Sequence, residues 1–265
     1  MSHVEVKDLA VVAGGRRVVD GVSFAVDSGE RVGIIGESGS GKSLSIFSVM
    51  GLLPRGLRAE GSIRVDGQEV VGASERALQA VRGGKVAMVF QDPSTALDPL
   101  TRVGAFLAEP LRRHRGLRGS ELEAAVRQGL EEVSLPSTER VLRAFPHELS
   151  GGQRQRVAIA AALACRPKVL LADEPTTALD VTVQAGILAL LQRVVEEHDM
   201  GLLFVSHDLA VVSQTVDRAL VMRRGQVVEE GAVGALISRP REAYTQRLVG
   251  SALALDRALT TGRIA

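Results

Sequence analysis

The chain has 265 residues, a length that predicts one large domain with room for an inserted lobe. Hydrophobic residues make up 45% and charged residues 24%, which excludes a wholly disordered chain. A formal net charge of +1 disfavours a protein that binds nucleic acid mainly through its overall positive charge. A single cysteine, Cys165, excludes an internal disulfide, and without a signal peptide or a run of about 18 apolar residues the sequence predicts a soluble cytoplasmic chain.

Short β-branched runs separated by glycine turns dominate the first third of the chain, and they predict strands of a mixed or antiparallel sheet. These runs cover residues 4–6, 18–19, 22–26, 31–35 and 62–65. A further run at 86–90 contains no polar residue, which predicts a strand buried on both faces.

The strand at 31–35 leads into a glycine-rich loop that fits the pattern G-x-x-x-x-G-K-S/T. The loop residues are Gly36, Glu37, Ser38, Gly39, Ser40, Gly41, Lys42 and Ser43. Glycines let backbone N–H groups form an anion-binding nest at the start of the helix that Leu44 opens. Lys42 would reach the β- and γ-phosphates and the Ser43 hydroxyl would bind Mg²⁺, so the motif predicts binding of a nucleoside triphosphate.

From about residue 103 to 164 the apolar residues recur at helical spacing, which predicts an inserted helical lobe. The recurring residues are Leu107, Leu111, Leu122, Val126, Leu130, Val133 and Val141. Strand patterns return at 169–172, 202–205 and 218–222, with a helical pattern over 183–198. This order predicts a parallel sheet with crossover helices.

Within the lobe, Ser150, Gly151, Gly152 and Gln153 precede a helical run and form a second potential anion site at a helix start. Because the glycine-rich loop already serves the chain's own phosphates, a second site of this kind suggests contact with another molecule's nucleotide. The alternative interpretation is a plain N-cap turn.

The strand at 169–172 ends in two carboxylates. Asp173 is expected at the carboxyl edge of the sheet, where phosphate-bound Mg²⁺ sits, and Glu174 is placed to polarise an attacking water. Downstream of a phosphate-binding loop, the pair predicts a magnesium site rather than a solvated loop.

With these motifs in this order, the chain resembles the ATP-binding subunits of ABC transporters from about residue 4 to 250. The resemblance identifies residues 36–43 as the Walker A loop, 149–153 as the signature motif and 169–174 as Walker B. It implies that Gln91 contacts Mg²⁺ or water, that Ala178, Leu179 and Asp180 form the D-loop, that Glu174 is catalytic, and that His207 binds the γ-phosphate.

The same resemblance implies an α/β P-loop NTPase fold with a RecA-like core, an N-terminal antiparallel β subdomain and an inserted α-helical subdomain over about 103–164. It assigns residues 1–250 to the ATPase domain and 251–265 to a short C-terminal tail. The family usually has an aromatic residue near position 13 that stacks on adenine, whereas Ala13 stands here. The base would then rest on aliphatic surface.

Closer sequence similarity in several segments makes the chain resemble the importer group for peptides or nickel. The matching segments are 51–54, 89–93, 96–100, 145–149, 172–182 and 239–245. Membership would imply ATP and Mg²⁺ as cofactors, a second ABC ATPase subunit in a heterodimer or homodimer, two integral-membrane permease subunits and an extracytoplasmic substrate-binding protein. It would imply no nucleic-acid partner, and a peripheral place at the cytoplasmic face of the inner membrane.

Two other functions are compatible with a phosphate-binding loop. An ABC-type ATPase of DNA repair or chromosome maintenance would need a long coiled coil or a zinc-bearing insertion between the two halves. A P-loop kinase would leave residues 150–152 and His207 without a role.

Overall fold

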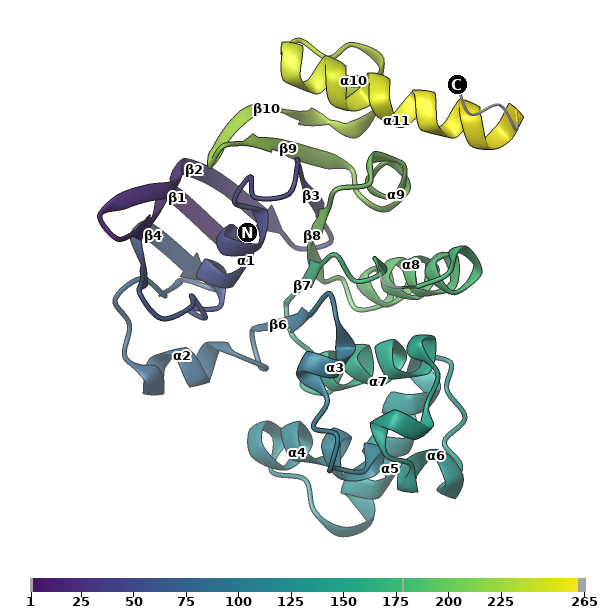
Figure 1. Cartoon of the computed structure of the whole chain (residues 1–265). Coiled ribbons are helices and arrows are strands. Elements are labelled where there is room, and N and C mark those ends of the chain that lie inside the picture. Colours follow the sequence, from purple (N-terminus) through teal and green to yellow (C-terminus); the bar gives the residue numbers. More distant parts are fainter. Residues whose placement is uncertain (1, 178, 262–265) are drawn as a thin grey trace.

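The computed structural model describes residues 2–177 and 179–261 of the chain. Over these residues two β-sheets meet through contacts of β2 with β8 and β10, and a helical lobe extends from the larger sheet (Figure 1). The teal lobe helices lie at the bottom of the view, apart from the purple N-terminal strands. The expected α/β fold with an antiparallel subdomain and an inserted helical subdomain is confirmed.

The smaller sheet is antiparallel, in the order β2-β1-β4-β5. Its strands are β1 (Ser2–Ala13), β2 (Arg16–Asp27), β4 (Leu57–Val65) and β5 (Gln68–Glu69). Gly14 and Gly15 join β1 to β2 at φ angles of 55° and 83°, the left-handed backbone that a two-residue type I′ hairpin turn requires at both positions. One face of this sheet packs against α1 (Lys42–Val49) in a shared apolar core.

The larger sheet has the order β10-β9-β3-β8-β7-β6, and its neighbouring strands are parallel except for β9 and β10. Its strands are β3 (Arg31–Ile35), β6 (Val86–Val89), β7 (Val169–Asp173), β8 (Gly201–Ser206), β9 (Arg218–Arg223) and β10 (Gln226–Ala232). Ile35 pairs with Ser206, and Asp173 pairs with Val205. Because parallel strands end at one edge, the loops after β3, β6, β7 and β8 emerge together, as ligand sites of such sheets require.

Helices pack around this sheet and complete the core. They are α2 (Glu75–Val81), α8 (Val181–Glu197), α9 (Leu209–Thr215), α10 (Val233–Ser238) and α11 (Ala243–Thr261). Every residue of β6, β7 and β8 is buried. For β6 this confirms the burial on both faces that its apolar run predicted.

The lobe is held together by apolar stripes on its helices. It consists of α3 (Pro93–Ala96), α4 (Val103–Arg115), α5 (Gly119–Glu132), α6 (Glu139–Arg143), the 3-10 turn η1 (Pro146–Glu148) and α7 (Gly151–Leu163). On α5 the buried residues Leu122, Val126 and Leu130 recur every fourth position and form one face of the helix. Helix α7 packs both on α4 and α5 and on β6 and α8, so it joins the lobe to the core.

Helix α11 crosses residue 250, so the division expected there falls within a helix. Residues 262–265 of the expected tail lie outside the described residues. Across residues 2–177 and 179–261, no helix combines the length and the apolar character that a membrane span needs.

Candidate active site

The loop between β3 and α1 depends on glycine at two points. A Cβ on Gly36 would lie 2.2 Å from the carbonyl oxygen of Met222, so no side chain fits there. Gly41 caps α1 at φ 102°, a left-handed conformation that L side chains rarely adopt. The strand, loop and helix therefore follow in the order that the motif predicted, with the helix N-terminus at the sheet edge.

Lys42 is buried inside this loop. Its side-chain Nζ donates hydrogen bonds to the carbonyl oxygens of Gly36 at 2.8 Å and Glu37 at 3.1 Å. Burial lowers the pKa of Lys42, and the nearby carboxylates of Glu174 and Asp173 act in the opposite direction. An ammonium group has three donors, so one N–H of Lys42 remains for a phosphate oxygen.

Ser43 and Asp173 meet beside the loop. The Ser43 hydroxyl donates to Asp173 Oδ1 at 3.1 Å. Asp173 ends β7 and is buried, and this burial raises its pKa, while the hydrogen bond from Ser43 and the charge of Lys42 lower it.

A hydroxyl and a carboxylate are hard oxygen ligands that suit Mg²⁺. The described residues contain no group of three or more His, Cys, Asp and Glu side chains that could hold a metal ion by itself. Ser43 and Asp173 therefore fit a Mg²⁺ ion whose remaining ligands come from phosphate oxygens and water, the arrangement typical of this ion.

Three loops converge on Glu174, which follows β7 and has φ 45°. Its Oε2 atom accepts hydrogen bonds from Gln91 Nε2 at 3.3 Å and from Thr177 Oγ1 at 3.0 Å. The Nδ1 atom of His207 lies 3.0 Å from the same oxygen. Within the described residues no hydrogen bond or ion pair reaches Oε1 of Glu174, so this oxygen can accept a hydrogen bond from a water molecule. The structure thus brings together the three residues that the resemblance implies for the reaction: Glu174 as the catalytic carboxylate, Gln91 for Mg²⁺ or water, and His207 for the γ-phosphate.

Two further residues of this site were not predicted. Thr177 holds the Glu174 carboxylate, and a hydroxyl three residues after a carboxylate in a loop is a local signal that could have found it. The hydroxyl oxygen of Tyr244 accepts a hydrogen bond at 3.0 Å from the backbone N–H of Glu37, and the guanidinium of Arg223 lies 5.0 Å from the Tyr244 ring centre. Tyr244 is the chain's only tyrosine, which is the one signal the sequence offers for it.

The signature segment, residues 150–153, caps α7. Ser150 Oγ accepts from the backbone N–H of Gln153, and Gln153 Oε1 accepts from the backbone N–H of Ser150, so the two residues form a capping box. A Cβ on Gly152 would lie 2.5 Å from Val183 Cγ1, which makes glycine necessary against α8.

The signature segment is not part of the chain's own phosphate site. Ser150 is exposed, and among the described residues no hydrogen bond joins residues 150–153 to residues 36–44. Figure 1 shows α7 in the lobe, well apart from α1. The N-cap turn considered as an alternative is therefore present, and its serine is exposed and makes no hydrogen bond to residues 36–44.

The remaining expectations concern the D-loop and the adenine site. Asp180 caps α8 by accepting a hydrogen bond from the backbone N–H of Val183 at 3.0 Å, while Ala178 lies outside the described residues. Ala13 ends β1 and is half-buried, and β2 brings Val19 next to the phosphate-binding loop, where a Cβ on Gly41 would lie 3.0 Å from Val19 Cγ2. An aliphatic surface for the base stays a prediction.

Comparison with known proteins found a family model and many relatives. The model described as ABC transporter matches residues 19–177. The oligopeptide transport ATP-binding protein OppD of Bacillus subtilis is 44% identical over 259 residues, which cover 96% of this chain and 72% of that protein. The peptidoglycan transport ATP-binding protein YejF of Agrobacterium fabrum is 46% identical over 94% of this chain, but the chain spans only 46% of its length.

Solved structures share the fold. The dimeric post-hydrolysis structure of the ATP-binding cassette MJ0796 bound to ADP and Pi has a TM-score of 0.76 and 31% sequence identity, and covers 87% of this chain and 98% of its own. The structure of cbiO1 from Clostridium perfringens, part of an ABC transporter complex, has a TM-score of 0.78 at 27% identity and covers 98% of this chain and 99% of its own.

Proposed function

Because the chain belongs to the ABC transporter family, we propose that it is the ATP-binding and ATP-hydrolysing subunit that energises an importer of peptides. The observation that carries the proposal is the convergence of Gln91, Glu174 and His207 beside the loop that holds Lys42 and Ser43. The sequence resemblance allowed either peptides or nickel as cargo. Peptides are favoured because relatives are named for oligopeptide transport.

In the proposed reaction the loop residues hold the nucleotide. Backbone N–H groups at the start of α1 and the remaining N–H of Lys42 would bind phosphate oxygens, which fixes the γ-phosphorus at the sheet edge. Ser43, Asp173 and Gln91 would hold Mg²⁺, which when bound neutralises charge on the phosphates.

Glu174 would act on the water. Three neighbouring groups fix Oε2, so Oε1 would accept a hydrogen bond from a water and orient its oxygen toward the γ-phosphorus. The bond between the γ-phosphorus and the oxygen that bridges it to the β-phosphate would break as the water oxygen attaches. ADP would leave with that bridging oxygen, and the proton that the water loses would pass to Oε1 of Glu174. His207 follows β8 at the same edge, where its ring would contact the γ-phosphate.

The signature segment, whose Ser150 is exposed, supports a head-to-tail pair of ATPase subunits. Ser150, Gly151 and Gly152 stand at the N-terminus of α7, a position suited to an anion, and they lie away from the chain's own loop. They would complete the nucleotide site of a second ABC ATPase subunit, in a heterodimer or a homodimer.

Two permease subunits and a substrate-binding protein would complete the transporter at the cytoplasmic face of the inner membrane. The lobe would dock the permeases, with Gln91 and the loop that follows as its hinge. Leu100, which is 85% exposed, lies in this loop and offers an apolar contact.

The two alternative functions are less compatible with the described residues. The longest helix of the lobe, α5, has 14 residues, about 21 Å, and is too short for a repair-type coiled coil. A P-loop kinase would still leave the exposed Ser150 turn and His207 without a role.

Copurification tests the proposed function. A tagged chain extracted from membranes in mild detergent is expected to bring two integral-membrane subunits and an ATPase subunit with it. A chain that is recovered entirely apart from membrane proteins, or together with DNA-bound proteins, would refute the assignment.

A further inference from the structure

We propose that Glu132, the last residue of α5, is a positioning residue that sets the orientation of the helical lobe and thereby that of the signature segment. The inference rests on the proposed function, because the effect of the signature segment on hydrolysis is part of that proposal. The contacts that support the inference lie at the C-terminal end of α5, away from the signature segment.

The carbonyl end of α5 is held by arginines from two other helices. The last carbonyl groups of a helix have no intrahelical donor. Arg193 of α8 donates through Nη2 to the carbonyl oxygen of Glu132 at 2.5 Å, and Arg156 of α7 donates through Nη1 to the carbonyl oxygen of Val133 at 2.7 Å. Cationic donors at this position also complement the helix dipole, so the end of α5 is fixed to both α7 and α8.

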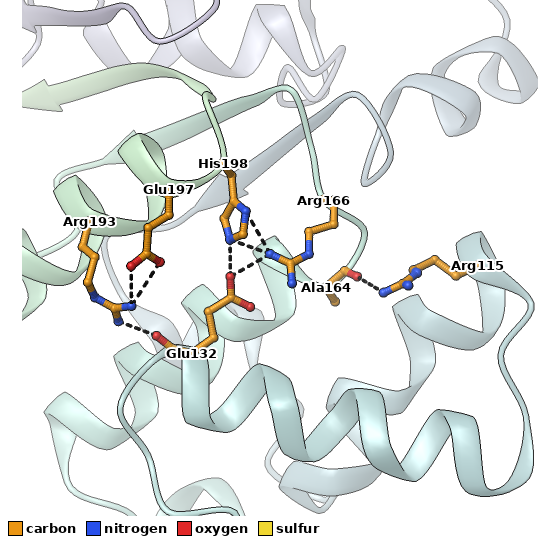
Figure 2. Close-up of polar contacts among 7 residues, drawn as sticks. All are labelled: Arg115, Glu132, Ala164, Arg166, Arg193, Glu197 and His198. Carbon is orange, nitrogen blue, oxygen red and sulfur yellow. Dashed lines mark hydrogen bonds and ion pairs between the residues drawn. The ribbon is translucent and has the colours of Figure 1, made fainter.

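The Glu132 side chain adds a second set of contacts (Figure 2). Its Oε1 atom accepts a hydrogen bond from Arg166 Nη1 at 2.9 Å and lies in close contact with Nε2 of His198. Arg166 stands in the connection from α7 to β7, and His198 caps the C-terminal end of α8. The Glu132 side chain is only 14% exposed, so these contacts are screened less than those of a surface ion pair.

The side chain of Glu132 contacts residues at the C-terminal ends of α7 and α8. The N-terminal ends of the same two helices carry predicted site residues. Helix α7 begins after Ser150 and has 13 residues, and α8 begins after Asp180 and has 17 residues. At about 1.5 Å per residue these helices are about 20 and 26 Å long. A tilt of roughly 10° at the Glu132 end would therefore move the Ser150 end by roughly 3 Å, and a misplacement of about 1 Å is enough to slow catalysis about 100-fold.

The other ion pairs of α5 do not link it to the core. Arg127 donates to Glu139 at 2.6 Å, and Arg143 donates to the same carboxylate at 3.1 Å. All three residues belong to the lobe, on α5 and α6. Glu139 therefore provides a control, because the loss of its carboxylate also breaks two side-chain contacts, those with Arg127 and Arg143, without touching the junction with α7 and α8.

The first measurement compares E132Q and E139Q in the complete transporter. We expect E132Q to lower kcat for ATP hydrolysis between about two- and thirtyfold, the range of coupling that packed networks transmit. The KM for ATP should change less than about twofold, because Lys42 and Ser43 lie outside the lobe. E139Q should keep both constants, and R166Q combined with E132Q should lower kcat by less than the product of the two single effects, since both side chains belong to one cluster of contacts with His198.

A distance measurement tests the orientation without activity. Spin labels on cysteines at Glu123 of α5 and Gln214 of α9, both exposed, report the position of the lobe relative to the core in a C165S background. The distance distribution should broaden or shift in E132Q and not in E139Q.

Two outcomes overturn the inference: E132Q lowers the melting temperature but leaves kcat and the distance distribution unchanged, or E139Q lowers kcat as much as E132Q does. If the wild-type complex hydrolyses no ATP, the proposed function fails instead. The distance measurement would then still decide whether Glu132 orients the lobe.

Discussion

Replacement of Glu174 by glutamine would separate binding from hydrolysis. All contacts of this carboxylate converge on Oε2, from Gln91, Thr177 and His207. In E174Q the amide oxygen would take this position, because Gln91 and Thr177 donate hydrogen bonds to it. The amide NH₂ group would then occupy the place of Oε1, where it donates a hydrogen bond instead of accepting one from water.

The expected loss follows from this exchange. A positioned general base contributes about 10²- to 10⁴-fold to a rate, which corresponds to about 3 to 5 kcal/mol on the barrier. ATP affinity should stay within about twofold of the wild type, since Lys42, Ser43 and Asp173 keep their contacts. The folded structure should also persist, because glutamine has the size and shape of glutamate.

The assay is single-turnover release of phosphate from the assembled complex, with nucleotide binding measured in parallel by a fluorescent ATP analogue. E75Q serves as the control, because Glu75 is exposed and, among residues 2–177 and 179–261, forms an ion pair only with Arg82, at 2.7 Å. Hydrolysis by E174Q within about threefold of the wild-type rate would refute the role of Glu174 in orienting water. Loss of ATP binding would refute the reasoning that the amide leaves the phosphate contacts intact.

Three further predictions concern Tyr244, Asp66 and the loop at residues 97–102. Y244F should lower the free energy of unfolding by about 0.5 to 1.5 kcal/mol in urea denaturation, because the N–H of the exposed residue Glu37 exchanges the tyrosine hydroxyl for water; unchanged stability would contradict this. The hydrogen bond from Lys168 lowers the pKa of Asp66, so this carboxylate stabilises the fold above its ordinary pKa of 3.8 and loses that effect as the pH falls through the lowered pKa. D66N should therefore be less stable than the wild type in urea at pH 7, and the difference should disappear at the acid end; a constant difference would speak against it. Cysteines at 97–102 should crosslink to a membrane subunit while those on the strands at 4–26 do not, and the reverse result would place the docking surface on the other subdomain.

Local patterns predicted the parts of the molecule that local physics determines. Residues 36–43 specify a loop between a strand and a helix because glycine is required where the backbone turns, and the structure has that loop. Asp173 and Glu174 follow an apolar strand, and parallel strands necessarily deliver their ends to one edge. The buried stripe of the lobe helices likewise followed from helical spacing.

Contacts between distant segments could not be predicted in this way. Glu37 and Tyr244 are 207 residues apart, and no periodicity relates a tyrosine hydroxyl to a backbone N–H. Glu132 sits among charged residues near the end of a helix, a pattern typical of a solvated face, and only the packing of α5 against α7 and α8 reveals its contacts with Arg166 and His198. Such pairings depend on how the elements are assembled, which single-sequence patterns do not encode.

The position of Tyr244 makes the intrinsic fluorescence of the protein sensitive to the phosphate-binding loop. The chain contains no tryptophan and one tyrosine, so its near-ultraviolet fluorescence, apart from the weak emission of phenylalanine, comes from a single ring. That ring lies beside the Arg223 guanidinium, and its hydroxyl accepts a hydrogen bond from the backbone N–H of Glu37 in the phosphate-binding loop. Rearrangement of the loop around a nucleotide would change the emission of this one fluorophore, so titrations of the isolated wild-type chain need no attached dye.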